Sequence, residues 1–251
     1  MALIHRINRK MHMICPPKLA ELMINLVVKK EVYPVVIMFH HVQPESEKED
    51  SPYTITPEKF EEIIKYYVDQ KYEFCFENEF YKAKGKRVIV SFDDGNTNNY
   101  EYAYPILKKY NAKASINIIS RKINTDVDNP YLSIDKINEM KASGLIQFQS
   151  HTCTHASLPD CDKGGYEMEV RESQKEILEQ LGINTDVFVY PFGRTNAEIS
   201  KYTSKYYKFA YGGYGDDIDF NYRLPREELF MSDNPTTLAR RTLYNLRYRN
   251  K

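Results

Sequence analysis

The chain has 251 residues, which is enough for one large α/β domain or two small ones. Lysine plus arginine equals aspartate plus glutamate at 35 each, so the formal net charge is zero. Nucleic-acid-binding proteins usually carry a basic excess, so this balance argues against that class. The four cysteines, at positions 15, 75, 153 and 161, form no C-x-x-C pair and no recognisable disulfide framework. We therefore expect a reducing compartment.

Residues 1–30 are basic and contain only a short, interrupted apolar run at 22–28. They show no signal-peptide core with a small-residue cleavage site, and the run is too short to cross a membrane. We therefore expect a cytoplasmic protein. Residues 17–29 are predicted to form a helix that either lies on an anionic membrane surface or packs under the rest of the fold. We treat 1–30 as an extension and 31–251 as one domain.

Strand-like apolar runs alternate with helical patterns along the rest of the chain. Thr56 is the predicted cap of the first helix of this series, with Pro57 at its first helical position. The predicted strands occupy residues 32–39, 72–76, 87–92, 112–119, 146–150, 186–190 and 209–211. The predicted helices occupy residues 57–68, 100–110, 133–143, 166–181 and 196–207. The tail after residue 215 has no clear assignment, apart from a last strand-like segment at 238–243.

This alternation predicts an α/β fold with a parallel sheet covered by helices. Six or seven such units in one chain favour a distorted or incomplete (β/α) barrel with about seven parallel strands over a doubly wound sheet. No Gly-x-Gly-x-x-Gly motif and no phosphate-binding loop follows a strand, which argues against a nucleotide cofactor.

Polar groups follow several of the predicted strands directly. One strand runs into Ser91-Phe92-Asp93-Asp94-Gly95 and another into His151-Thr152-Cys153-Thr154-His155. A third ends in Pro191-Phe192-Gly193, and the first strand ends in His40-His41. In a barrel of parallel strands these ends converge on one face, so we expect the four groups to lie close together.

Two histidines and one aspartate are a suitable ligand set for zinc with an open position. An Asp-Asp-Gly turn lets one carboxylate bind a metal while its neighbour stays free as a base. The combination points to hydrolysis of a polarised carbonyl. Ordinary turn chemistry and two unrelated surface histidines remain the alternatives. Cys153 is expected to pack inward, because a thiolate ligand would weaken the Lewis acidity that hydrolysis needs.

These motifs resemble those of the polysaccharide deacetylases, carbohydrate esterase family 4. Residues 91–95 match the (Thr/Ser)-Phe-Asp-Asp-Gly motif in full, and His151-Thr152-x-x-His155 matches His-(Ser/Thr)-x-x-His. Residues 189–193 match the third motif, Arg-x-Pro-Tyr-Gly, in part, and residues 38–42 resemble the "Tyr-His" opening strand of an exopolysaccharide-acting subset. The resemblance covers roughly residues 33–243, judged from the order of strands and motifs.

The resemblance implies a NodB-like, distorted (β/α) barrel that removes N-acetyl, sometimes O-acetyl, groups from sugar polymers. Asp93 would be the general base, and Asp94, His151 and His155 would hold a divalent metal, with zinc expected first and cobalt or nickel as alternatives. The backbone N–H of Phe192, between Pro191 and Gly193, would bind the oxyanion.

Two family residues are missing. The arginine that orients the base falls at Val189 here, and Arg240 or Arg241 is our candidate replacement, against the alternative of a solvated basic pair. The late Leu-x-His, which supplies the general acid, is absent, because no histidine follows His155. We expect His40 to be the acid, with His41 second, against the alternative of a structural histidine.

The expected substrate is an acetylated glycan or a lipid- or nucleotide-linked sugar precursor, handled at the inner membrane surface, with no nucleic acid and no obligate protein partner. Two other functions remain open. One is a metal hydrolase of small non-sugar amides on the same fold, and the other is a carbohydrate-binding protein with a decayed site.

Overall fold

Eight strands, each parallel to its neighbours, form one curled sheet in the computed structural model, which describes residues 14–47, 51–123, 130–212 and 222–248. The strand order is β10-β1-β5-β6-β7-β8-β9, and β4 pairs with the first half of β5. The strands are β1 (Val35–Phe39), β4 (Glu73–Cys75), β5 (Arg87–Phe92), β6 (Ala114–Ile118), β7 (Ile146–Ser150), β8 (Val187–Val189), β9 (Phe209–Tyr211) and β10 (Glu227–Glu228). A separate parallel pair joins β2 (His41–Val42) to β3 (Thr54–Ile55).

The two edges of the sheet approach each other just before β10. Tyr211 of β9 forms a single parallel bridge with Leu224, and backbone hydrogen bonds join Leu224 to Ala210 and to Gly212. Among the described residues this contact is far shorter than a regular strand pair, so the curled sheet forms an incomplete barrel. The predicted fold class is confirmed.

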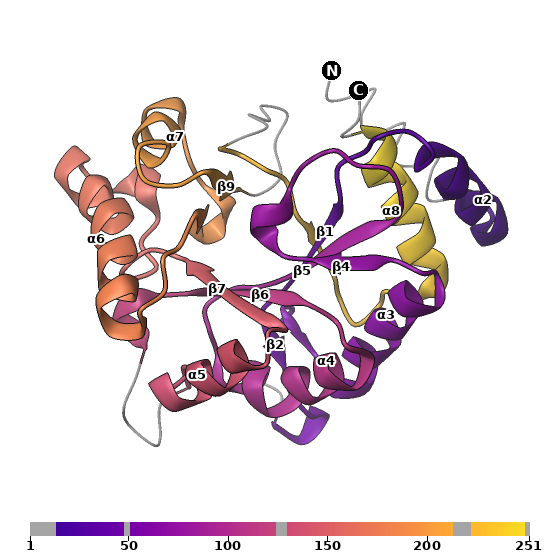
Figure 1. Ribbon diagram of the computed structural model, residues 1–251, viewed down its shortest axis with the longest axis horizontal. Helices are drawn as coiled ribbons and strands as arrows, with labels where there is room; N and C mark the ends of the chain where they lie inside the picture. Colours follow the sequence, from indigo (N-terminus) through magenta and orange to yellow (C-terminus); the bar gives the residue numbers. More distant parts are fainter. Residues whose placement is uncertain (1–13, 48–50, 124–129, 213–221, 249–251) are drawn as a thin grey trace.

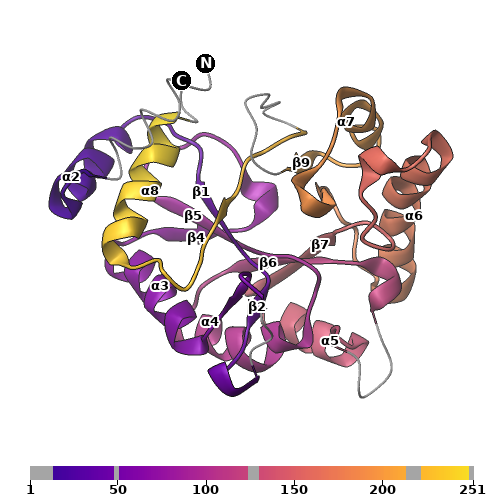
Figure 2. The same cartoon turned by 180° about the vertical axis from the view of Figure 1, so that it is seen from behind.

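Helices cover the outer face of the curled sheet, as Figures 1 and 2 show from opposite sides. They are α2 (Pro17–Val27), α3 (Pro57–Asp69), α4 (Tyr104–Tyr110), α5 (Ile134–Ala142), α6 (Lys163–Leu181), α7 (Ala197–Thr203) and α8 (Pro235–Tyr248), with a π-helical turn at Asn99–Ala103 before α4. Outward-facing Val88, Val90 and Phe92 of β5 pack with Phe60 and Ile64 of α3 in one buried cluster.

The helix boundaries follow from local capping. The hydroxyl of Thr56 accepts a hydrogen bond from the Lys59 N–H, and Ser133 caps α5 in the same way through Lys136. Gly182 ends α6 in the left-handed conformation, at φ 61°. α6 begins three residues earlier than the apolar pattern indicates, because Asp162 caps it by accepting from Gly165 N–H.

The prediction of a last strand-like segment at 238–243 is wrong, because these residues belong to the helix α8. Its buried residues recur with helical spacing, at Leu238, Thr242 and Leu246 on one face with Ala239 and Leu243 beside them. The true last strand, β10, has only two residues, too few to produce a recognisable pattern.

The barrel interior has an apolar lower part and a polar upper part. Alternation along each strand points Val36, Ile89 and Val189 inward, where they pack with Tyr211 and Leu224. Nearer the carboxyl ends, the inward positions are polar and fully or almost fully buried. These polar positions are Ser91, Ser115, Asn117, Gln149 and Arg226.

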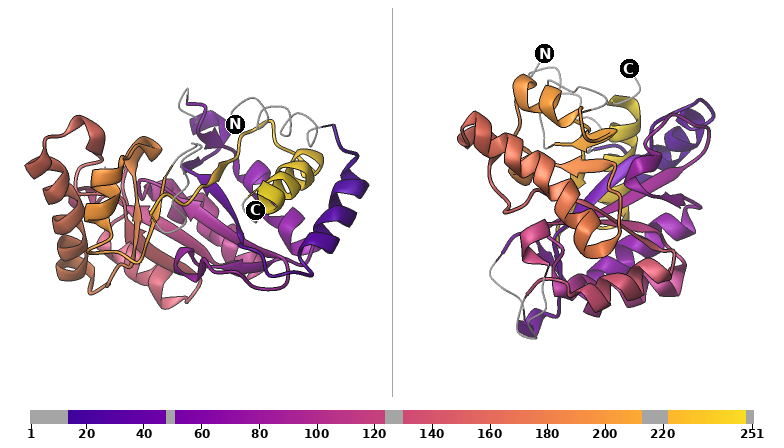
Figure 3. Two further views of the ribbon diagram at one scale, coloured as in Figure 1. Left: turned by 90° about the horizontal axis from the view of Figure 1, so that it is seen from above. Right: turned by 60° about the vertical axis from the view of Figure 1, so that its left-hand side comes forward.

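Helix α2 lies against α8 on the outside of the barrel (Figure 3). Ala20, Ile24 and Val28 bury one side of this segment in the main apolar cluster. Leu22 and Leu26 remain exposed. Among the described residues, no helix is both long and apolar enough to cross a membrane. The basic residues Arg6, Arg9 and Lys10 lie outside the described residues.

Candidate active site

The carboxyl ends of β1, β5, β7, β8 and β10 surround a cavity of about 510 Å³. Four strand ends that carry predicted site residues therefore meet, as expected for parallel strands. The cavity lining includes the predicted residues His40, Asp93, Asp94, His151, His155, Phe192 and Gly193.

Asp94, His151 and His155 form a compact cluster whose ligand atoms all lie within 4.8 Å of one another. Oδ1 of Asp94 is 3.3 Å from Nε2 of His155 and 3.6 Å from Nε2 of His151. This buried oxygen has no hydrogen-bond partner in the described part of the chain. Nδ1 of His151 lies 2.8 Å from the Val189 carbonyl, so it donates there and leaves Nε2 as the acceptor that faces Asp94.

The electrostatics of this cluster suit a metal ion. Burial lowers the pKa of both histidines, that of His151 to about 3, so both imidazoles are neutral and able to ligate. Burial, together with the charge of Asp93, raises the pKa of Asp94 to about 6. Two imidazole nitrogens and one carboxylate oxygen converge on one point. The donor set therefore fits a divalent transition metal.

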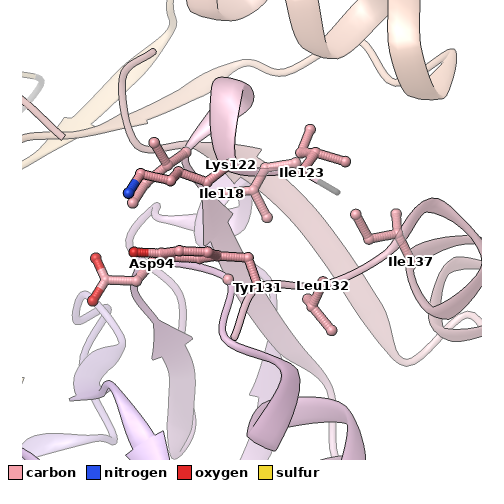
Figure 4. A pocket seen from close by; sticks show the side chains of 9 residues that line it. Asp94, Ile118, Lys122, Ile123, Tyr131, Leu132 and Ile137 are labelled. Carbon is pink, nitrogen blue, oxygen red and sulfur yellow. The ribbon is translucent and has the colours of Figure 1, made fainter. Parts of the chain in front are cut away.

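Both ligand-bearing turns adopt backbone conformations that side chains rarely tolerate. Asp94 has φ 71° and Gly95 φ 73°, and a Cβ on Gly95 would lie 2.8 Å from Cγ2 of Ile118. Figure 4 shows Asp94 at the rim of the small pocket around Ile118, with its carboxylate directed away from Leu132. Close packing against β6 therefore fixes the direction of the Asp94 side chain.

The histidine turn is held from the opposite side by Glu169 of α6. Its carboxylate accepts hydrogen bonds from the backbone N–H groups of Cys153 and Thr154 and from the Thr154 hydroxyl. These bonds hold a turn in which His155 has φ 69°. Cys153 is fully buried and outside the ligand cluster, packing inward as predicted.

Asp93 points into the barrel, where Arg226 holds it with a bidentate pair of hydrogen bonds. Nη1 donates to Oδ1 at 2.6 Å and Nη2 to Oδ2 at 2.8 Å, and Nδ2 of Asn117 donates to Oδ1 at 3.0 Å. Burial alone would raise the pKa of Asp93. Arg226, followed by His151 and His40, outweighs burial and holds that pKa well below its usual range. Asp93 is therefore ionised and fixed in orientation.

The prediction of Arg240 or Arg241 as the partner of Asp93 is wrong. Arg240 donates to the Cys15 carbonyl, and Arg241 pairs with Glu227 and Asp233. Both arginines lie on α8, which covers the outside of the barrel and faces away from the cavity. The sequence reasoning missed Arg226 because it precedes a two-residue strand. The only local signal is its position directly after Leu224-Pro225, in the unassigned tail.

Of the two candidate acids, His40 is the one that lies beside Asp93. Its Nε2 is 4.0 Å from Oδ2 of Asp93, and its Nδ1 is 3.9 Å from Oε1 of Glu228, which the sequence reasoning also missed. Burial lowers the pKa of His40, although the charges of Asp93 and Asp94 oppose this. His41 lies at the cavity edge, with Nδ1 3.1 Å from Nδ2 of Asn98.

The third motif forms a tight turn after β8. Pro191 is buried, whereas Phe192 is exposed, has φ 58° and places its ring centroid 4.8 Å from that of His155. Phe192 and Gly193 both adopt the left-handed conformation, and both line the cavity beside His155.

The sequence profile of the family described as polysaccharide deacetylase matches residues 81–218, which span the acid, histidine and third motifs. This chain belongs to the polysaccharide deacetylase family. The family assignment agrees with the ligand cluster and with the barrel that carries it.

Three relatives illustrate the similarity. A Bacillus subtilis protein named putative polysaccharide deacetylase YxkH is 36% identical over 49% of this chain, but the match spans only 43% of that relative's length. A Staphylococcus epidermidis poly-beta-1,6-N-acetyl-D-glucosamine N-deacetylase is 30% identical over 71% of this chain and 69% of its own. The crystal structure of a Bacillus cereus polysaccharide deacetylase superimposes with a TM-score of 0.74 at 26% identity, covering 85% of this chain and 69% of that one.

The pairing of Arg226 with Asp93 predicts a stability effect that can be measured without substrate. Arg226→Met leaves a buried carboxylate without its partner and should reduce the free energy of unfolding by about 3–5 kcal/mol. Arg226→Met combined with Asp93→Asn should recover part of this loss, since no buried charge is then unpaired. Arg240→Met is the control and should cost about 1 kcal/mol. Urea unfolding followed by circular dichroism measures all four proteins, and equal losses at Arg226 and Arg240 would contradict the assignment.

Proposed function

We propose that this protein is a metal-dependent deacetylase that hydrolyses N-acetyl groups on a glycan or glycan precursor. The observation that carries the proposal is a fixed, ionised carboxylate, Asp93, beside a separate cluster of metal-ligand type in one cavity. The name of the Staphylococcus epidermidis relative, an N-deacetylase, favours amides over O-acetyl esters as substrates.

Zinc is the metal we propose, with cobalt or nickel as alternatives, held by Asp94, His151 and His155. Neutral imidazoles with one carboxylate are common zinc ligands at catalytic sites that keep a position open. A divalent ion at this position supplies Lewis acidity toward the acetyl carbonyl.

The protein's own groups divide the proton transfers. Asp93 takes a proton from the attacking water, and Arg226 keeps the carboxylate oriented throughout. His40 donates a proton to the leaving nitrogen, for which its place beside Asp93 at the cavity wall is suitable. The backbone N–H of Phe192, in the turn Pro191–Gly193, stabilises the developing oxyanion. The products are acetate and a free amine.

The arginine position bears on the alternative of a decayed binding protein. The missing motif arginine at Val189 favours decay, but Arg226, in the segment before β10, supplies a bidentate guanidinium to Asp93. The support for the base is therefore present, and we favour an enzyme. A hydrolase of small non-sugar amides uses the same groups, so substrate length is the property that distinguishes it.

The central experiment measures acetate release from N-acetylglucosamine oligomers and from small amides. Wild-type protein should release acetate from the oligomers, lose this activity with a chelator and regain it with zinc. Asp93→Asn should lower kcat by about 10²–10⁴-fold while zinc remains bound, because the base but no ligand is removed. Activity that survives in Asp93→Asn would exclude Asp93 as the base, and turnover of small amides alone would favour the second hydrolase function.

The role of His40 is tested by the choice of leaving group. His40→Ala should slow the hydrolysis of amides at least about tenfold more than that of activated acetate esters, whose leaving groups need no proton. His41→Ala is the matched control, because the neighbouring ring lies at the cavity edge and not beside Asp93. Equal losses on both substrate types in His40→Ala would count against an acid.

We further propose that α2 places the protein on an anionic membrane surface, where a lipid-linked substrate would be met. Its packed side is buried against α8, but Leu19, Leu22 and Leu26 are exposed on its other side. Exposed Lys18, near the start of the helix, and Lys29 and Lys30, after its end, supply positive charge. An exposed apolar stripe flanked by lysines suits insertion at the interface of anionic lipids.

Vesicle sedimentation tests this placement. The wild-type chain should sediment with phosphatidylglycerol vesicles more than with phosphatidylcholine vesicles, and added salt should weaken the binding. Replacing Leu19, Leu22 and Leu26 with serine should lower the bound fraction at least about fivefold. Leu178→Ser, at an equally exposed leucine of α6, is the control. Unchanged binding of the triple variant would contradict the role of α2.

A further inference from the structure

Glu77 is a buried carboxylate that the proposed reaction does not use. It lies in the short 3₁₀ turn Glu77–Glu79 after β4, directly below Asp93 in the polar part of the barrel interior, and it is completely inaccessible to solvent. A buried carboxylate lowers stability unless it is well paired, and an apolar residue is often more stabilising at such a position. The presence of Glu77 therefore calls for a reason other than packing.

One oxygen of Glu77 organises two neighbouring side chains. Oε1 accepts from the Ser91 hydroxyl at 2.6 Å and from Nδ2 of Asn117 at 3.2 Å. The other oxygen, Oε2, is buried without a hydrogen-bond partner among the described residues. Burial raises the pKa of Glu77 to about 7, against the opposing influence of Arg226 and of these two hydrogen bonds. Glu77 is thus a hydrogen-bond acceptor, and only one of its two carboxylate oxygens has hydrogen-bond partners among the described residues.

The direction of the hydrogen bond at Ser91 depends on Glu77. The Ser91 oxygen also lies 3.1 Å from Nη1 of Arg226 and 3.1 Å from Nδ2 of Asn117, and both of these groups are donors. A hydroxyl has one proton, so Ser91 accepts from Arg226 and from an Asn117 N–H that it shares with a carboxylate, and it must donate to Glu77. Without an acceptor at residue 77, this hydroxyl proton would turn toward donors.

The orientation of Asn117 depends on Glu77 as well. Its Nδ2 group lies between Oε1 of Glu77 and Oδ1 of Asp93, at 3.2 and 3.0 Å. A flipped amide would place its oxygen against two carboxylate oxygens, so carboxylates on both sides select the orientation in which Asn117 donates. If the Glu77 carboxylate is lost, one of these two constraints on Asn117 disappears, and the hydrogen bond from Asn117 to Asp93 weakens.

We propose that Glu77 is a positioning residue for the deacetylation. It fixes the hydrogen-bond directions of Ser91 and Asn117, and through them the arrangement of Arg226 and Asn117 on Asp93. This inference rests on the proposed function of Asp93 as the base. Glu77 touches neither the cavity nor the ligand cluster, so its loss should change the rate of the reaction and leave substrate and metal binding intact.

The test compares Glu77→Met, which removes the acceptor, with Glu77→Gln, which keeps an acceptor oxygen of similar size. We expect Glu77→Met to lower kcat by about 10- to 100-fold, as loss of outer partners of a site typically does, with KM and zinc content within about twofold of wild type. Glu77→Gln should restore kcat to within about threefold. Glu79→Met, in the same turn but partly exposed and bonded to Phe76 N–H, is the matched control and should keep wild-type kcat.

Several results would overturn the inference: wild-type kcat in Glu77→Met, a loss of zinc that accounts for the lower rate, or an equal loss in Glu77→Gln. If Glu77→Met does not fold, Ser91→Ala interrupts the same path with a smaller change. A lower kcat at constant KM then supports the inference, and an unchanged kcat overturns it.

A crystal structure of Glu77→Met separates this inference from the proposed function, because it requires no turnover. We expect Asn117 to turn away from Asp93 and the two Arg226–Asp93 hydrogen bonds to change in length. An unaltered Asn117–Asp93–Arg226 arrangement would overturn the positioning role even if the wild-type protein deacetylates glycans. An altered arrangement would support it even if the wild-type protein proves inactive on every substrate tested.

Discussion

The ion pair between Asp93 and Arg226 is the interaction on which the arrangement of the site depends. Both side chains are almost completely buried, at 3% and 4% exposure, so each charge is tolerable only because the other is in contact with it. The pair joins β5 to the segment that leads into β10, at the point where the sheet nearly closes. One guanidinium, that of Arg226, therefore links the strands near the point of closure and also fixes the orientation of Asp93.

Adjacent carboxylates acquire different chemistry because the backbone turns between them. Asp93 still follows the alternation of β5 and points inward to Arg226, whereas Asp94, at φ 71°, turns toward His151 and His155. Arg226 lowers the pKa of Asp93, while burial and the charge of Asp93 raise that of Asp94. Environments that separate the pKa values of two carboxyl groups in this way are typical of sites with divided acid–base roles. The close approach of Gly95 to Ile118 fixes this division.

The sequence was informative where a feature is local. The strands β5 and β7 and the cap Thr56 were predicted closely, because periodicity and capping depend on neighbours in the chain. Arg226 was missed because it lies 133 positions from Asp93 and meets it only through the register of a two-residue strand. Arg240 and Arg241 were misplaced because a short apolar run does not distinguish a strand from a helix. Tertiary packing makes their segment part of the helix α8.

The hydrogen bonds at Asp93 also determine from which side it can act. A carboxylate offers about four acceptor positions. Oδ1 accepts from Arg226 and Asn117, and Oδ2 accepts from Arg226 alone among the described residues. The remaining acceptor position is therefore on Oδ2, which lies 4.0 Å from Nε2 of His40 and 4.0 Å from Nε2 of His151. Arg226 and Asn117 therefore occupy the acceptor positions of Oδ1. Oδ2 keeps one position for a proton donor that lies between His40, the proposed acid, and the cluster of Asp94, His151 and His155.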